Sequence, residues 1–258
     1  MKRSSQVMTT AAVALSVLIA AILPSVPGAA AAAVAGQRDK TSPVASMTRP
    51  TAQFTTNNSV AVAWSAIDNG SGVASSDVRV QRSAVLGGPK SLWTTWKSKT
   101  TATSGVFTAI AGYRYCFSVR ARDRAGNVSQ WSSPRCTLLP IDDLTLYSSV
   151  GWVRVDKQVG GWLGGTNSSI GEQGAWLQTF DPVSVTRVGV VAKTGPTCAT
   201  IAVFVGSVRV GTLDLSHQAA SPRRLVLLAP FHGRRTGILK LVAMNAGEFQ
   251  IDGLSVAP

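Results

Sequence analysis

The sequence is poor in the side chains that most enzymes use for acid–base chemistry. Among its 258 residues are only two histidines and two glutamates. A Ser-His-Asp set would have to come from Asp214, Ser216 and His217, and such close neighbours do not build a triad, which is assembled from separate elements. Glycosidases use two carboxylates across a cleft, and no Asp or Glu stands beside an aromatic cluster in a motif typical of a glycosidase family. The sequence therefore predicts a protein that is not an enzyme.

Motifs for metals and phosphates are scarce as well. The three cysteines, Cys116, Cys136 and Cys198, have no CxxC spacing, and there is no HxxxH pair, so a zinc site is not expected. The glycine-rich stretch at 160–165 (GGWLGG) lacks the Lys and Ser/Thr of a phosphate loop, and no helix pattern follows it. No cofactor is expected.

Long apolar runs are absent except near the start of the chain. Lys2 and Arg3 precede an apolar run at 11–23, and a stretch of small residues follows, which is the order of a secretory signal peptide. We expect a signal peptide over 1–35, cleaved after Ala35. The alternative is an uncleaved anchor, but the run is shorter than the roughly 20 residues of a spanning helix. We expect a secreted protein with no membrane span after cleavage.

Acidic residues are few, and the charge is uneven. The formal net charge is +13. From Gly36 to Pro140 there are thirteen Lys and Arg against four Asp, a net +9, whereas from Ile141 to Pro258 there are ten against eight, a net +2. The basic half suits an anionic cell-wall polymer, or serves solubility alone. Nucleic acid is not expected as a partner, because no recognition motif accompanies the charge.

Signals for helices are missing, whereas alternation of period two is frequent. In 59–67 (SVAVAWSAI) Val60, Val62 and Trp64 share one face, and the stretch 113–122 alternates in the same way. Such alternation is typical of half-buried antiparallel strands. Turn-rich pieces such as DNGSGVAS, LGGPK and DRAGN separate these segments. After a polar linker at 36–43, the pattern predicts a β-sandwich over 44–139.

This first sandwich resembles a fibronectin type III module of the bacterial kind. The resemblance rests on Trp64 in an early strand, the alternating Tyr115, Phe117, Val119 and Ala121, the turn DRAGN and a Ser-rich final strand. It implies that Tyr115 makes the corner hydrogen bond and that Trp64 fills the core. It also implies an Ig-like arrangement of about seven strands, and it specifies a fold rather than a function.

The second half, 140–258, is again rich in strand patterns punctuated by glycine. We expect eight strands, in GWVRV, AWLQTF, VTRVGVVA, ATIAVFV, VRVGTLDL, RRLVLLA, GILKLVAM and EFQIDGLSV. The spacing, VGTLDL and the closing IDGLSV resemble jelly-roll, galactose-binding-like modules, which hold sugars by aromatic stacking at loop ends. Trp162, flanked by glycines, is the candidate for sugar stacking, and core packing is its alternative. The expected fold class is all-β, with two tandem sandwiches.

The first two cysteines lie at equal distances from Gly126. If DRAGN is the turn of a hairpin centred there, Cys116 and Cys136 face each other across adjacent antiparallel strands, at a separation that a disulfide tolerates. Export permits such a bond to persist. Cys198 is left as a half-buried thiol or a partner in an intermolecular bridge.

Two further sets of residues are candidates for binding. Asp68 and Asn69 in one loop and Asp123 and Asn127 in another would lie at the same end of the sandwich, where their oxygens suit calcium. Turn geometry is the favoured explanation of the same residues. Four arginines on the outer face of two neighbouring strands could form an anion-binding face, with a solvated sheet surface as the alternative. They are Arg79, Arg114, Arg120 and Arg122.

These features together favour a secreted, non-catalytic binding or adhesion protein. It would act at the cell envelope or on extracellular polysaccharide, and its partner would be a glycan or an anionic cell-wall polymer. The alternatives are an accessory component of polysaccharide hydrolysis and a structural spacer.

Overall fold

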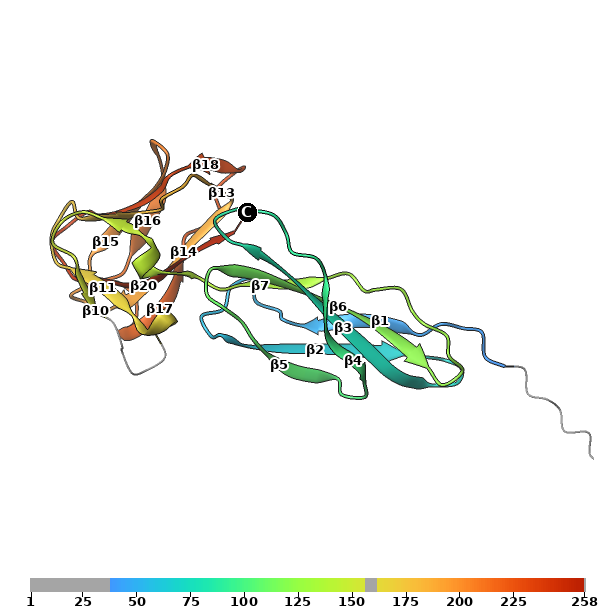
Figure 1. Cartoon of the computed structure of the whole chain (residues 1–258). Coiled ribbons are helices and arrows are strands. Elements are labelled where there is room, and N and C mark those ends of the chain that lie inside the picture. Colours follow the sequence, from blue (N-terminus) through green and yellow to red (C-terminus); the bar gives the residue numbers. More distant parts are fainter. Residues whose placement is uncertain (1–37, 156–161, 258) are drawn as a thin grey trace, which may run out of the picture. The chain divides into compact units, whose positions relative to one another are not determined.

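The chain is all-β and is built from β-sandwiches (Figure 1). The computed structural model describes residues 38–155 and 162–257. The predicted signal peptide at 1–35 lies outside these residues. From Arg38 onward the described residues belong to one compact unit. In the described ranges no helix has the length and apolarity needed to cross a membrane.

The first sandwich consists of two antiparallel sheets. One has three strands in the order β1-β2-β5, and the other has four in the order β4-β3-β6-β7. The bounds are β1 Val44–Arg49, β2 Ser59–Ile67, β3 Val73–Ala84, β4 Thr94–Thr100, β5 Ser104–Thr108, β6 Tyr113–Asp123 and β7 Arg135–Leu138.

Alternation along these strands fills the core of the first sandwich. Trp64 in β2 is 3% exposed, and Phe117 and Val119 in β6 have no exposed surface. The phenolic oxygen of Tyr115 accepts a hydrogen bond from the backbone N–H of Ile110 at 3.0 Å. Trp64 and Tyr115 therefore occupy the core and corner roles that the resemblance implied.

The second sandwich pairs a six-stranded sheet with a five-stranded one. The first runs β10-β11-β20-β14-β17 with β8 also on β20, the second runs β16-β15-β19-β12-β9, and β13 pairs β18. The six-stranded sheet comprises β8 Ile141–Asp142, β10 Val153–Val155, β11 Asn167–Ile170, β14 Arg187–Thr194, β17 Ser221–Leu227 and β20 Phe249–Ala257. The other strands are β9 Tyr147–Ser148, β12 Trp176–Gln178, β13 Val183–Val185, β15 Thr200–Val205, β16 Val208–Asp214, β18 Arg235–Gly237 and β19 Leu239–Ala243, and the 3-10 turns are η1 Asp143–Thr145 and η2 Leu163–Gly165.

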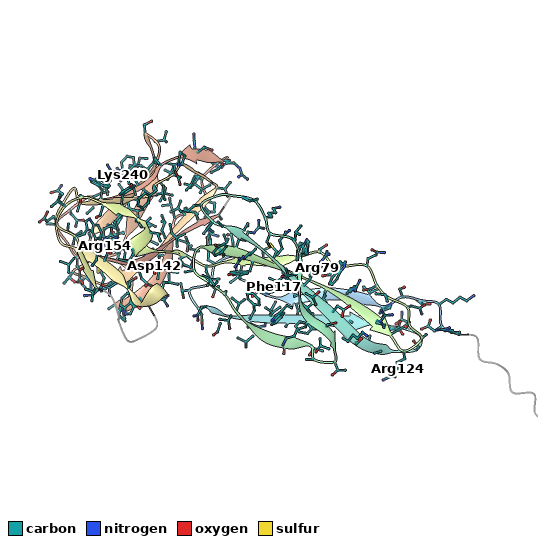
Figure 2. All side chains as sticks on the ribbon, viewed as in Figure 1. Arg79, Phe117, Arg124, Asp142, Arg154 and Lys240 are labelled. Carbon is teal, nitrogen blue, oxygen red and sulfur yellow. A yellow bond between two sulfur atoms is a disulfide. The ribbon has the colours of Figure 1, made fainter. Side chains whose placement is uncertain are left out.

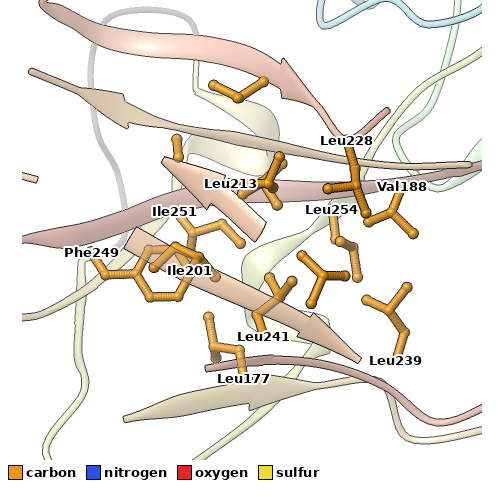
Figure 3. Packing of buried hydrophobic residues seen from close by; sticks show 14 of the residues in the cluster. Leu177, Val188, Ile201, Leu213, Leu228, Leu239, Leu241, Phe249, Ile251 and Leu254 are labelled. Atoms are coloured by element: carbon orange, nitrogen blue, oxygen red, sulfur yellow. The ribbon is translucent and has the colours of Figure 1, made fainter. Parts of the chain in front are cut away.

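The core of the second sandwich lies between its two large sheets. Figure 3 shows Phe249, Ile251 and Leu254 of β20 packed with Ile201 of β15 and Leu241 of β19. All five side chains have no exposed surface. Every residue of β20 except the half-buried Gln250 is buried, and the strand is central in its sheet, paired on one edge with β11 and β8 and on the other with β14.

Every segment expected to be a strand in the second half contains one. Strands β8, β9, β11, β13 and β18 were not expected; they have two to four residues each, too few for alternation to be visible. The chain passes from the sheets of the first sandwich to those of the second between Leu138 and Ile141. The domain boundary at 139/140 stays a prediction.

Candidate functional site

A cavity of about 640 Å3 opens beside Trp162. Its wall residues include the half-buried Trp162, the exposed Asn57, Asn58 and Ile110, and Arg223. The volume lies in the range of about 300–1,000 Å3 that is usual for small-ligand sites. Trp162 is therefore at the wall of a cavity, as a stacking residue must be.

Hydrogen bonds fix the backbone around Trp162. The N–H of Leu163, the next residue, donates to the Oδ1 atom of the buried Asp252 at 2.8 Å. The carbonyl of Trp162 accepts from the N–H of Gly165 at 3.2 Å. Gly164 has a φ of 60°, and a Cβ there would overlap the Asp142 carboxylate. Glycine is thus required at this position, and the turn after the indole is fixed by local bonds.

Arg223 is anchored on both sides of its guanidinium group. Its Nε atom forms an ion pair with Asp252, which has no exposed surface. Its Nη2 atom donates to the carbonyl oxygen of Thr56 at 3.0 Å. Burial raises the pKa of Asp252, and the hydrogen bond and the charge of Arg223 oppose that rise. The charge of Arg223 is thus largely compensated, while its position in the cavity wall is fixed.

The cavity wall combines an aromatic residue with polar ones. The indole of Trp162 provides a flat apolar face for stacking. The Oδ1 atom of Asn57 accepts from the N–H of Ser59 at 2.8 Å, which leaves its amide N–H groups for a ligand. A few polar residues beside an apolar one in a cavity wall are typical of a site that fixes a polar ligand in one orientation.

A second buried acid lies in the same region. The hydroxyls of Ser168 and Thr166 donate to the two oxygens of Asp143, which has no exposed surface. Burial raises the pKa of Asp143 to about 6, and the charges of Asp142 and Asp252 add to this rise. Asp143 is not a wall residue of the Trp162 cavity.

The outer face of β3 and β6 carries the expected arginines, but two of them contact other side chains of the protein. The Arg79 guanidinium, labelled in Figure 2, lies 4.4 Å from the ring centroid of Trp93 and 4.1 Å from that of Trp131. Arg120 lies 4.7 Å from the Trp131 ring and pairs with Asp77 at 3.0 Å. Burial lowers the pKa of Arg79, with the charge of Arg120 second. These two cations stack on indoles instead of facing solvent freely.

The other two arginines of this face have different surroundings. Arg122 is exposed and donates from Nη1 to the carbonyl oxygen of Gly126 at 3.1 Å. Arg114, at the opposite end of β6, borders two cavities away from the tryptophans. The four arginines therefore do not form one uniform stripe, and anion binding by them stays a prediction.

Carboxylates from three segments meet at one end of the first sandwich. Asp68 and Asp123, both expected there, are joined by Asp39, and one oxygen from each lies within 4.8 Å of the others. Asp68 accepts backbone N–H groups from Gly70 and Gly72 at 3.1 and 2.7 Å. These bonds are of the kind that turns use, and calcium binding stays a prediction.

The expected asparagines of these loops differ in their roles. Asn127 acts as a donor, since its Nδ2 atom bonds the carbonyl of Asp39 at 3.0 Å and the Oδ2 atom of Asp123 at 2.7 Å. Asn69 is exposed and is not among the residues that meet. The N–H of Ser71 donates to Asp39 at 2.7 Å and is the main cause of its lowered pKa. The described part of the expected linker is thus bonded to both loops.

The neighbours Asp214, Ser216 and His217 do not have the geometry of a catalytic triad. The Nδ1 atom of His217 lies 2.6 Å from Asp214 and 3.1 Å from the Ser216 hydroxyl. In a triad the acid and the nucleophile bond opposite ring nitrogens, whereas here both bond the same one. The Ser216 hydroxyl is the main cause that lowers the pKa of Asp214 to about 2.

Cys116 and Cys136 form a disulfide. They are directly opposite in the pairing of β6 with β7, with Cα atoms 4.0 Å apart. Cys198 is a free, buried thiol, and burial raises its pKa.

Comparison with known proteins shows similarity of structure without similarity of sequence. No protein-family model and no curated protein matches the chain. A carbohydrate-binding module of the β-sandwich superfamily is similar to it, with a TM-score of 0.37 and 12% identity over 85% of this chain and 100% of the module. The Streptomyces avermitilis α-L-rhamnosidase gives 0.26 and 17% over 83% of this chain, and the rhamnosidase of Dictyoglumus thermophilum gives 0.34 and 9% over 84%. The matched region spans 22% and 28% of those two enzymes.

Proposed function

We propose that this protein is a non-catalytic, secreted binding protein that holds a polysaccharide through the cavity beside Trp162. The observation that supports the proposal is the cavity itself. Trp162, two asparagines and the anchored Arg223 line a space of about 640 Å3. The disulfide between Cys116 and Cys136 suits an oxidising location such as the cell exterior.

The residues around the cavity favour binding over hydrolysis. No Asp or Glu of the described chain lines it, whereas glycosidases use two carboxylates across the scissile bond. The nearby Asp252 is buried and paired with Arg223. A binding role also serves an accessory component of polysaccharide hydrolysis, whereas a structural spacer would bind no polymer.

The test is retention of the full secreted chain on insoluble neutral polysaccharides and on purified cell wall. Trp162→Ala should weaken retention about thirtyfold, because a central aromatic contact contributes about 2 kcal/mol. Trp162→Phe, which keeps a ring, should retain part of the binding. The part of wild-type retention that depends on Trp162 should persist at high salt, because salt does not screen stacking.

Trp176→Ala is the matched control, since this indole packs in β12 beside Lys240 and does not line the cavity. It should bind as wild type does. Equal losses in the two variants would refute the role of Trp162. Failure of wild type to bind any polymer would refute polysaccharide binding and leave the spacer. Release of reducing sugar from any of these polymers would show an enzyme.

A further inference from the structure

Two cavities lie on either side of Arg114. One of about 280 Å3 has Arg135 in its wall, and one of about 320 Å3 has Lys90 and Arg234. Arg114 and Leu138 belong to both walls, so the cavities are neighbours. We call them together the Arg114 groove. Its walls share no residue with those of the Trp162 cavity.

The cations of the Arg114 groove are not engaged by other groups of the protein. Within 38–155 and 162–257, the side chains of Arg114, Lys90 and Arg234 have no hydrogen bond, ion pair or ring contact. Arg135 uses only Nε, which donates to the carbonyl oxygen of Met47 at 2.7 Å. That bond orients the guanidinium and leaves both of its terminal nitrogens available. Arg79 and Arg120, in contrast, each stack on an indole ring, and Arg120 also pairs with Asp77.

The charge of the groove is uncompensated as well. No Asp or Glu among the described residues lines either cavity. Four cations around two concave spaces raise the local concentration of anions. The flat guanidinium fork of Arg114 or Arg135 matches the two oxygens of a carboxylate or phosphate.

Neutral polar groups complete the walls. The Oε1 atom of Gln53 accepts from Arg187 at 3.3 Å, which leaves its amide N–H groups for a ligand. Thr51 adds a hydroxyl to the same cavity, and Ser83 and Ser184 add hydroxyls to the other. Hydroxyls and amides beside guanidinium groups suit a ligand that carries both acid and alcohol groups, as an acidic sugar does.

We propose that the Arg114 groove binds an acidic polysaccharide, with the carboxylate or phosphate groups of the polymer in the two cavities. The inference goes beyond the Trp162 site, because it defines a second site with a different chemistry. A polysaccharide fits better than a single-stranded nucleic acid, because no aromatic side chain among the described residues lines either cavity for base stacking.

The test uses affinity electrophoresis of the full chain through gels that contain one polymer at a time. Polygalacturonate supplies carboxylates on a polysaccharide, a phosphomannan supplies phosphates on a polysaccharide, single-stranded DNA represents nucleic acid, and dextran is the neutral control. At low salt Arg114→Gln should weaken retention by the acidic polymers about tenfold, the value of one charge-assisted hydrogen bond. Arg122→Gln is the matched control, because it removes the same charge from an exposed side chain of the same strand outside both cavities.

Each outcome of this test has one meaning. Loss in Arg114→Gln but not in Arg122→Gln supports the groove, and the stronger of the two acidic polymers identifies its anion. Equal losses in both variants show diffuse attraction only and overturn the site, as does an unchanged Arg114→Gln. Retention by single-stranded DNA that exceeds both polymers and depends on Arg114 overturns the polysaccharide assignment.

The two sites can fail separately. Arg114→Gln should leave retention on neutral polymers unchanged, whereas Trp162→Ala should remove it and leave the salt-sensitive retention on acidic polymers. Urea unfolding of each variant excludes loss of fold as the cause. Arg114→Lys provides a second variant, since it keeps the charge and removes the fork; intermediate retention is expected, and retention below that of Arg114→Gln would contradict the proposal.

Discussion

Asp143 is a carboxylic acid buried where an ion is costly. It has no exposed surface, and hydroxyl groups rather than a cation donate to its oxygens. Burial raises its pKa from 3.8 to about 6. The native state therefore binds more protons than the unfolded state between these two values, and its stability must fall as pH rises through them.

We expect the free energy of unfolding to fall by about 2 kcal/mol from pH 3.8 to about 6, and to lose most of this slope above that range. Asp143→Asn should flatten the profile, because a neutral amide does not titrate and the Ser168 and Thr166 hydroxyls can turn to accept its N–H groups. Urea titrations at several pH values measure this. A part of the pH dependence should remain in Asp143→Asn, because the pKa of Asp252 is also raised.

The exposed Asp181→Asn is the control for removal of a carboxylate and should keep the wild-type slope. If Asp143→Asn kept that slope as well, the buried acid would not be its source.

The roles of some single residues could be predicted from the sequence, and those of others could not. Alternation places Trp64, Tyr115 and Cys116 on definite faces, because side chains in a strand point alternately to the two sides. Asp39 was missed, since its bond to Ser71 spans 32 positions and depends on how two loops fold. Trp131 was missed as a partner of Arg79 for the same reason, because it lies outside the strands, in the segment before β7.

The hairpin of β6 and β7 shows how far a pattern extends to a whole element. Symmetry about Gly126 gives the pairing of Cys116 with Cys136 correctly. Pairing as strands begins only at Arg135, however. Before it, the hydroxyls of Ser129 and Ser132 accept the backbone N–H groups of Ala121 and Val119 at 2.9 and 3.2 Å. Side chains thus replace part of the ladder, which alternation alone cannot reveal.

The disulfide in this hairpin should contribute strongly to stability. It closes a loop with a sequence separation of 20, so Cys116→Ala with Cys136→Ala should lower the free energy of unfolding by roughly 3 kcal/mol in the chain-entropy model. Urea unfolding with and without reductant measures this. Reductant should lower the stability of the wild type to that of the double variant and leave the double variant unchanged.

Cys198 is present in both proteins and serves as the internal reference. Burial raises the pKa of its thiol, which keeps it protonated and slow to exchange. A peptide map in which Cys198 is bridged to either hairpin cysteine would contradict the assignment, as would equal stability of the two proteins under oxidising conditions.

For the whole molecule, the sequence allowed the fold class to be predicted better than the binding sites. Two sandwiches follow from period-two segments separated by turns, because this pattern is local. The walls of the Trp162 cavity combine residues near 57, 110, 162 and 223, and only the tryptophan was foreseen. The excess of positive charge was plain in the composition. The fold decides which Lys and Arg side chains contact a tryptophan or a carboxylate, and so which of them remain available to a ligand.

Two sites of different chemistry in one chain predict a dependence on polymer length. A long polysaccharide with neutral and acidic units can occupy the Trp162 cavity and the Arg114 groove at once, whereas a short fragment occupies one. Because the second contact is then intramolecular, affinity for the polymer should exceed that for its tetrasaccharide fragments by about a hundredfold at equal sugar mass.

Trp162→Ala or Arg114→Gln alone should remove most of this gain in affinity, and Arg122→Gln should preserve it. Calorimetry with a graded series of fragments measures the gain; equal affinity at every length would show that one chain does not occupy both sites together.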